Sequence, residues 1–269
     1  RTIVKALVAP QEPSNEGWFR PLDVVAEPGT IFTAEKPSPT GWYYEGSVHA
    51  SELVWKALAP LVPSRFSAGS YSSLCVVYLS GTDSSGEPFV HIEPQHGGWG
   101  ASEDRDGANA LIALTDGDTY NYSVEAIEAR FPIIVRQYAL NVEGGVGAGR
   151  RRGGFGIVRD YEVLGDDAVA YCSLGRTKTL PWGMSGGAEG SANVVQIISA
   201  DGNSTRSYGR NPHIPLSRGD VVRIVTGGGG GWGDPVLRER HLIEDDVLKG
   251  LISEEEASRV YGYVPGRAE

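Results

Sequence analysis

Five runs rich in β-branched residues dominate the chain between residues 133 and 233. Clusters of Gly, Asp, Asn and Pro separate these runs, and strands bounded in this way are typical of antiparallel sheets. Parallel βαβ units would require helical segments between successive strands, and this part of the sequence shows no such alternation. We therefore predict a β-rich α+β fold built on an antiparallel sandwich or barrel-like unit. The runs are IIVRQYAL (133–140), GFGIVRDYEVL (154–164), AVAYCSL (168–174), NVVQIIS (193–199) and DVVRIVT (220–226).

The segments on either side of this unit have different sequence patterns, with helical periodicity and loops. Residues 1–132 read as a mixed α/β part that contains a glycine-rich loop. Within it, apolar residues at three- and four-residue steps predict an early helix over 47–61. The first forty residues read as loops and turns with a short strand at 22–26. Residues 234–269 read as a C-terminal tail of two helices, and the second opens with the capping box Ser253–Glu256. The sequence thus predicts three parts, 1–132, 133–233 and 234–269.

Charge and cysteine content exclude several functional classes. With 24 Lys and Arg against 34 Asp and Glu, the formal net charge is −10. Nucleic acids and anionic membranes select basic surfaces, so we exclude both as main partners. Cys75 and Cys172 are too few for a disulfide framework or a cysteine zinc site. We expect two buried thiols in a reducing compartment, and hence a cytoplasmic protein.

The segment VHIEPQHGGWGASEDRDG (90–107) is the first candidate site. His91 and Glu93 alternate along a predicted strand, so their side chains share one face. Histidine titrates near neutrality, and a neighbouring carboxylate can tune it for proton transfer. We therefore take His96, Glu93 and His91 as candidate catalytic residues, with Gly97, Gly98 and Trp99 against a ligand. The alternative is a hairpin with a surface histidine and a polar loop, and the segment lacks the ligand spacing of a metal site.

Other segments contain further candidate binding residues, and each of these also has a purely structural interpretation. In GGVGAGRRRGGFG (144–156), Arg152 could bind an anion, or the arginines could pair with carboxylates across strands. The run TGGGGGWGDP (226–235) formally contains GxGxxG but lacks a βαβ context, so we expect a flexible or tightly turned loop there. Asn121 could bind a ligand amide, or belong to a plain polar turn. The motif GMSGG (183–187) does not fit a serine-hydrolase elbow.

Several of these motifs together carry a resemblance to a known family. In order, they are NEGWFRPLDVVAEPGTIF, HGGWGASEDRDG, NYSVEAIEARFPI, GAGRRRGGFGIVRDYEVL, PWGMSGGAEGSAN and TGGGGGWGDP followed by VLKGLISEEEASRVYGYV. From about Asn15 to Val264 the chain resembles the C-terminal part of the large subunit of the hydantoinase B/oxoprolinase family. The resemblance implies part of an ATP-dependent enzyme that opens cyclic amides such as hydantoins, 5-oxoproline or lactams. The related acetone and acetophenone carboxylases imply an alternative, a biotin-independent ketone carboxylase subunit.

The resemblance also implies partners and cofactors. Family members work with a hydantoinase A-type subunit that binds ATP and magnesium. A divalent metal, Zn or Mn, belongs to the N-terminal half of the large subunit, whose GTHxxD-like motif is not found among these residues. The chain begins at Arg1, and we expect the other half to be a separate chain. This chain alone would then bind no metal or nucleotide and act on a small-molecule substrate in a complex. The remaining alternative is a non-catalytic scaffold.

Overall fold

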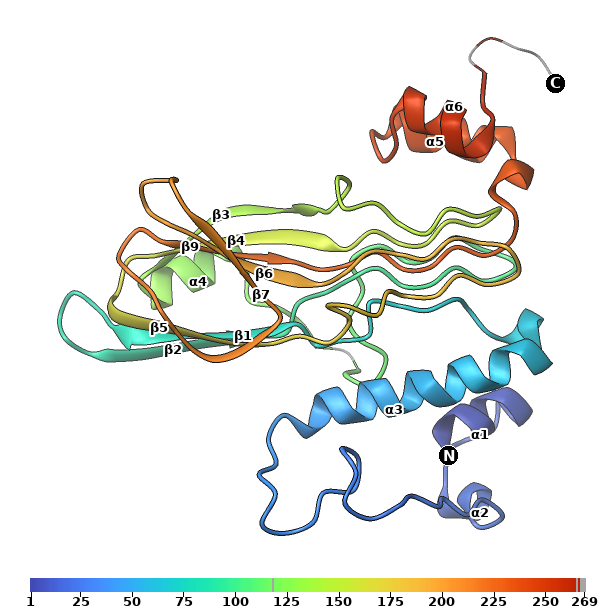
Figure 1. Cartoon of the computed structure of the whole chain (residues 1–269), viewed down its shortest axis with the longest axis horizontal. Coiled ribbons are helices and arrows are strands. Elements are labelled where there is room, and N and C mark those ends of the chain that lie inside the picture. Colours follow the sequence, from blue (N-terminus) through green and yellow to red (C-terminus); the bar gives the residue numbers. More distant parts are fainter. Residues whose placement is uncertain (118, 265, 267–269) are drawn as a thin grey trace.

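Nine strands build two antiparallel sheets that lie face to face (Figure 1), within a computed structural model that describes residues 1–117, 119–264 and 266. The predicted β-rich α+β fold with antiparallel pairing is therefore confirmed. One sheet has the order β2-β1-β5-β8, with β1 Val76–Thr82, β2 Pro88–Glu93, β5 Asp166–Ser173 and β8 Arg210–Pro215. The other has the order β3-β4-β9-β6-β7, with β3 Ile133–Leu140, β4 Ile157–Val163, β6 Val194–Ile198, β7 Thr205–Tyr208 and β9 Val221–Val225.

The main hydrophobic core lies between the two sheets. In β6 and β9, for example, alternate residues point inward, as strand geometry requires, and the outward ones are more exposed. Burial of each large aliphatic side chain contributes roughly 1.5–3 kcal/mol. The inward residues include Val77, Leu79 and Ile214 from the first sheet and Val195, Ile197, Val222 and Ile224 from the second, all at most 3% exposed.

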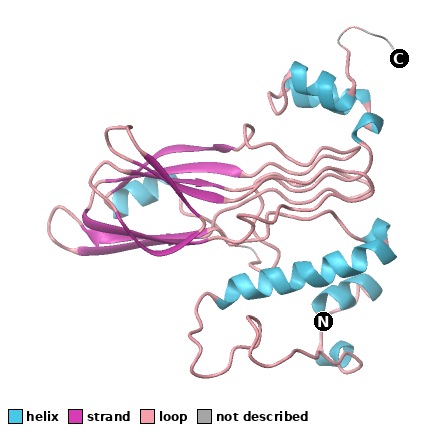
Figure 2. Ribbon diagram, viewed as in Figure 1, coloured by secondary structure: helices cyan, strands magenta, loops and turns pink. Residues whose placement is uncertain are grey.

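Helices cover the edges and ends of this sandwich (Figure 2). Helix α4 ends shortly before Pro132, and its N-cap Ser123 accepts a hydrogen bond from the Ala126 amide. The predicted N-cap Ser253 is also confirmed, because its side chain accepts from the Glu256 amide at the start of α6. The helices are α1 Thr2–Val8, α2 Glu16–Phe19, α3 Tyr43–Leu58, α4 Val124–Arg130, α5 Arg240–Leu248 and α6 Glu254–Tyr261, with 3-10 turns at Ala59–Leu61, Pro63–Arg65 and Pro235–Leu237.

The N-terminal region differs from the sequence prediction in three ways. Helix α3 begins at Tyr43 rather than residue 47, and its last predicted turn is 3-10. Two helices, α1 and α2, precede it where loops were predicted. The strand predicted at 22–26 was wrong, because Val24 and Val25 are 68% and 90% exposed and lie outside both sheets. An extended segment without a neighbouring strand has no partner for its backbone groups.

Beyond the strand ends, the glycine-rich segments run side by side in a bundle (Figure 1). Residues 227–231 form its centre, and all five are buried. Their partners repeat every three residues. Gly227 and Gly230 bond to segment 98–101, Gly228 and Gly231 to 184–191, and Gly229 and Trp232 to 147–154. Three residues per turn is the period of an extended polyproline-II-like chain, which satisfies its backbone groups only through neighbours.

The close approach of these segments explains why the residues are glycines. A Cβ built on Gly229 would lie 2.0 Å from the Trp99 carbonyl oxygen, and one on Gly98 would lie 1.9 Å from that of Gly154. Real Cβ atoms do not approach backbone atoms so closely. The expectation of a flexible or tightly turned loop at 226–235 was therefore wrong. The run is the packed centre of a bundle that extends the sandwich.

Candidate active site

A cluster of polar side chains lies where β2 ends, between the two sheets. The predicted alternation holds, because His91 and Glu93 both point inward and are 2% and 3% exposed. Glu93 Oε1 accepts from the Tyr122 amide at 2.5 Å, and its Oε2 accepts from the Tyr161 hydroxyl at 3.0 Å. The Arg159 guanidinium Nη1 lies 3.1 Å from the same Oε2. His91 Nε2 lies 3.4 Å from it without a hydrogen bond.

The surroundings of Glu93 keep this buried carboxyl ionised. Burial alone would raise its pKa, but His91 beside it, the Arg159 charge and the Tyr122 amide together hold the pKa below its ordinary value. A buried carboxylate with this set of partners is a fixed acceptor. Glu93 therefore carries a negative charge at neutral pH, and this charge acts on His96.

His96 lies at the outer side of this cluster and is half-buried. Its Nδ1 is 3.5 Å from the Tyr138 hydroxyl, and its backbone carbonyl accepts from Thr226 Oγ1 at 2.7 Å. Burial and the Arg159 charge lower the pKa of His96. The Thr119 carbonyl, Glu93 and Asp116 oppose this shift without cancelling it. The imidazole is therefore neutral at pH 7 and able to accept a proton.

The remaining residues predicted to contact substrate have their groups engaged elsewhere. The Gly97 amide donates to the Leu111 carbonyl at 2.9 Å and the Gly98 amide to that of Gly227 at 3.0 Å, so neither proton is free for an anion. Trp99 Nε1 donates to the Ile112 carbonyl, and Asn121 Nδ2 to that of Pro94, both at 2.8 Å. The buried Oδ1 of Asn121 has no partner. Contacts of these residues with substrate stay predictions.

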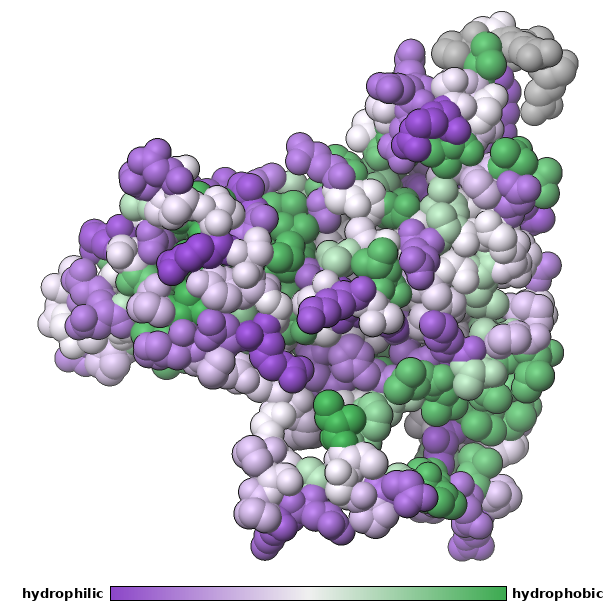
Figure 3. Space-filling model, in the orientation of Figure 1, coloured by the Kyte–Doolittle hydropathy of each residue, from purple (hydrophilic) through white to green (hydrophobic). Residues whose placement is uncertain are grey.

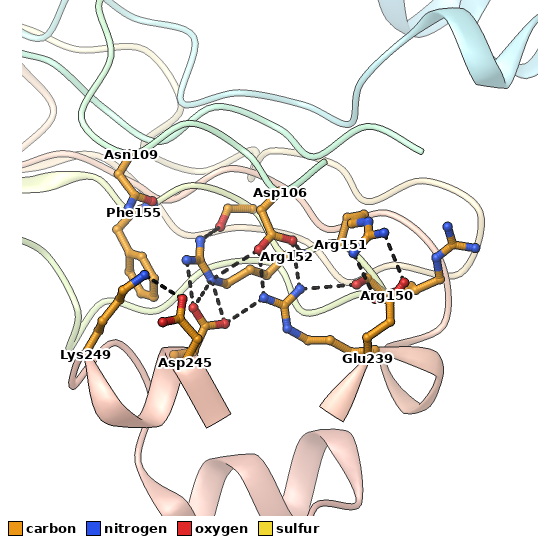
Figure 4. A network of polar contacts seen from close by, with 12 residues as sticks. Asp106, Asn109, Arg150, Arg151, Arg152, Phe155, Glu239, Asp245 and Lys249 are labelled. Atoms are coloured by element: carbon orange, nitrogen blue, oxygen red, sulfur yellow. Dashed lines mark hydrogen bonds and ion pairs between the residues drawn. The ribbon is translucent and has the colours of Figure 1, made fainter. Parts of the chain in front are cut away.

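Arg152 lies outside the cluster, in an ion-pair network that fastens the C-terminal helices (Figure 4). Its Nε and Nη2 bond to Asp246 of α5 at about 3 Å, and its Nη1 donates to the Gly153 carbonyl. Arg238 bridges Asp246 and Asp106 at 2.7 Å. Burial would raise the pKa of Asp106, but the Arg238 charge outweighs it and lowers the pKa. The predicted anion contact of Arg152 finds no support here, because its fork already holds a carboxylate.

The described residues include no cluster suited to a metal ion, and the glycine run 227–231 does not form a phosphate cradle. Among residues 1–117, 119–264 and 266, no group of three or more His, Cys, Asp or Glu is placed to hold a metal ion. The glycine run 227–231 does not fit a phosphate cradle, because its amides already donate within the bundle. None of the helices in the described ranges has the length and apolarity needed to cross a bilayer.

Comparison with known proteins now decides the family. The sequence profile of the family named hydantoinase B/oxoprolinase matches residues 1–235. The chain belongs to this family. An uncharacterised protein of Methanocaldococcus jannaschii is 35% identical over 259 residues, which are 96% of this chain and 44% of that protein. The caprolactamase subunit beta of Pseudomonas jessenii is 30% identical over 275 residues, covering 94% of this chain and 45% of that subunit.

Solved structures of two enzymes share this fold. The ATP-dependent caprolactamase of Pseudomonas jessenii superposes on the whole chain with a TM-score of 0.85 at 24% identity, over 48% of its own chain. An acetone carboxylase structure matches 78% of this chain with a TM-score of 0.65 at 19% identity. The matched part is 33% of the acetone carboxylase chain. The hydantoinase B/oxoprolinase chain described here thus spans less than half of the length of these proteins.

Sequence reasoning missed Arg159, Tyr138 and Tyr161, which complete the cluster. Arg159 and Tyr161 are buried on β4, and Tyr138 pairs with Arg159 across β3 and β4. One signal was present. In the alternation of IVRDYEV, Arg159 falls on the same face as the apolar Ile157 and Val163, and a charge on a buried face requires a partner.

Proposed function

We propose that this chain is part of the catalytic large subunit of an ATP-dependent cyclic-amide hydrolase of the hydantoinase or 5-oxoprolinase type. The observation that carries the proposal is the match of residues 1–235 to the family, together with a fold that follows the ATP-dependent caprolactamase over the whole chain. Among the relatives, proteins from Dictyostelium discoideum and Arabidopsis thaliana are themselves named 5-oxoprolinases.

The same proposal assigns partners to the chain. We infer that the other half of the large subunit and a hydantoinase A-type subunit complete the enzyme. They would carry the Zn or Mn ion and ATP with magnesium. Exposed apolar side chains over α3 and the following turn support such contacts (Figure 3). Leu53, Val54 and Leu61 are 56%, 41% and 76% exposed. The buried thiols of Cys75 and Cys172, free of disulfides, support a cytoplasmic location.

Within this enzyme, the residues of the cluster would move and hold a proton. An unstrained amide is a poor electrophile, and ATP supplies the phosphoryl group that activates its oxygen. His96, neutral and half-buried, would accept the proton of the attacking water. Glu93 would stabilise the imidazolium so formed, because its carboxylate is fixed by the Tyr122 amide and the Tyr161 hydroxyl. His91, which is sealed in the core, would hold Glu93 in place.

Replacing His96 by Ala in the reconstituted complex is expected to lower turnover about 10²–10⁴-fold, because the general base is lost. The free energy of unfolding should change by less than about 1 kcal/mol, since the side chain is only half-buried. Steady-state rates with hydantoin, 5-oxoproline and caprolactam, and urea unfolding, measure the two effects. His213→Ala, on the exposed face of β8, serves as the control. Unchanged turnover in the His96 variant would eliminate it as the base.

The lowered pKa of His96 predicts the acid limb of the pH profile. Below its pKa the imidazole is protonated and cannot act as a base, so kcat/KM should fall with decreasing pH. The groups around it are Arg159, Glu93, Asp116, Tyr138 and the Thr119 carbonyl, and their net effect with burial lowers the pKa from 6.5. We expect the acid limb of kcat/KM to have its midpoint below pH 6.5. A limb centred above pH 6.5 would contradict this assignment.

Two alternatives lead to different products or to none. A ketone carboxylase subunit, favoured by the fold shared with acetone carboxylase, would incorporate labelled bicarbonate into a new carboxylate. A cyclic-amide hydrolase would instead convert the amide to a ring-opened acid, and this acid would contain no label from bicarbonate. If the chain is a non-catalytic scaffold, changes at His96 and Glu93 would alter assembly of the complex but leave its turnover intact. Product analysis with the purified complex separates these outcomes.

A further inference from the structure

Arg159 is an unusually placed arginine in this protein. Its side chain is 0% exposed and lies between two tyrosine rings. The guanidinium carbon is 4.4 Å from the Tyr138 ring centroid and 5.0 Å from that of Tyr161. Cation–π contacts of this kind engage the faces of a guanidinium and leave its N–H edges for hydrogen bonds.

One edge of this guanidinium is unfilled. Nη1 lies 3.1 Å from Glu93 Oε2 and 3.5 Å from Gln95 Oε1, whereas Nε and Nη2 are buried without a partner. Nε and Nη2 together form the side-on fork that matches the two oxygens of a carboxylate. In the described part of the chain, no other arginine has both of these atoms buried and unpartnered.

The protein itself shows what this fork binds elsewhere. Nε and Nη2 of Arg152 hold Asp246, and Nε and Nη2 of Arg223 hold the two oxygens of Asp160 at 2.8 and 2.7 Å. At Arg159 the nearby carboxylate of Glu93 does not pair with the Nε/Nη2 edge. Glu93 Oε1 already accepts from the Tyr122 amide and Oε2 from the Tyr161 hydroxyl, and Oε2 is also ion-paired with Arg159 Nη1. A buried donor left unpaired destabilises the fold, so an external acceptor would be stabilising.

We propose that the Nε/Nη2 edge of Arg159 is a binding site for the carboxylate of a small molecule, with the Tyr138 ring as its cover. Tyr138 is 46% exposed and lies beside half-buried His96, so it is the ring next to Arg159 through which we take the ligand to approach from solvent. The unpartnered nitrogens of His91 and Oδ1 of Asn121 are further polar atoms of the same cluster that lack hydrogen bonds. This inference concerns binding alone and does not depend on the hydrolase activity.

The test follows the Arg159 Nε–H resonance directly. The 269-residue chain is labelled with ¹⁵N-arginine, and the Nε signals are assigned through bonds from the backbone. It is then titrated with sodium acetate, with sodium chloride at equal ionic strength, and with neutral acetamide. We expect a saturable shift of the Arg159 signal with acetate only. The Arg223 signal, whose fork is filled by Asp160, should not move. No saturation with acetate would overturn the proposal in favour of bound water, and an equal response to chloride would overturn it in favour of a non-specific anion effect.

Two variants sharpen the result. Arg159→Lys keeps the charge but removes the fork, and should weaken acetate binding about tenfold or more. Arg223→Lys makes the same exchange where the fork is occupied and should leave acetate affinity unchanged. If Arg159→Lys does not fold, the titration of the unaltered chain still decides the question. Acetate affinity retained in a folded Arg159→Lys protein would show that the anion binds elsewhere.

Discussion

Replacing Asp246 by Ala is expected to destabilise the folded chain by about 3–5 kcal/mol, because it leaves buried cations without their partner. Asp246 is 2% exposed in α5 and bonds to both Arg152 and Arg238, whose side chains are 8% and 0% exposed. After the change Arg238 would keep Asp106. Arg152 would keep only the Gly153 carbonyl and a 4.0 Å approach to Asp106. Urea unfolding, with hydrogen exchange of α5 and α6, measures the loss.

The neighbouring residue provides a matched control. Asp245 pairs with Lys249 one helical turn away, but both side chains are about half-exposed, and exposed pairs contribute at most about 1 kcal/mol. Asp245→Ala should therefore have little effect. If Asp246→Ala cost no more than Asp245→Ala, the network would not be what fastens α5 and α6 to the bundle.

The second large effect is expected at the centre of the glycine bundle. Gly229→Ala should destabilise the chain by at least about 3 kcal/mol, because the new Cβ would meet the Trp99 carbonyl oxygen at 2.0 Å. The obstacle is backbone of a packed neighbouring segment, which cannot turn aside as a flexible side chain can. Soluble yield and thermal unfolding of the variant measure the effect.

A glycine outside the bundle gives the opposite expectation. Gly46 lies in α3, and a Cβ added there would meet no atom within 4 Å beyond its own helix. Gly46→Ala should therefore stabilise the chain by up to about 1 kcal/mol, the difference in helix propensity. A Gly229→Ala protein as stable as the unaltered chain would mean that the bundle opens readily.

The sequence predicts the strands well because their signal is local. Runs rich in β-branched residues identify β3, β4, β5, β6 and β9, and the alternation of His91 and Glu93 falls on β2. The sequence misses β7 and β8, whose residues Thr205–Tyr208 and Arg210–Pro215 are mostly polar and exposed at a sheet edge. The glycine bundle is missed for another reason. A run of glycines has no side-chain periodicity, and its order comes from neighbours that lie far away in the chain, such as Gly98 for Gly227.

In the candidate site, too, local sequence patterns predict some residues correctly, whereas residues brought in from other strands are missed. Alternation along one strand places His91 and Glu93 together correctly. It says nothing of Arg159, which comes from β4, or of Tyr138, which comes from β3. Arg152 attracts attention in the sequence as part of a basic run among glycines. Its true partner, Asp246, lies 94 residues further on, so no local pattern reveals that its charge is already neutralised.

The glycine bundle also affects how stability changes with temperature. Exposure of apolar surface raises the heat capacity on unfolding, whereas exposure of peptide groups lowers it. The bundle is held by backbone hydrogen bonds and contains few side chains, so its unfolding exposes mainly peptide groups. This region therefore adds little to the heat-capacity change of the chain. Its contribution to the free energy of unfolding should vary less between cold and warm conditions than that of the sandwich core.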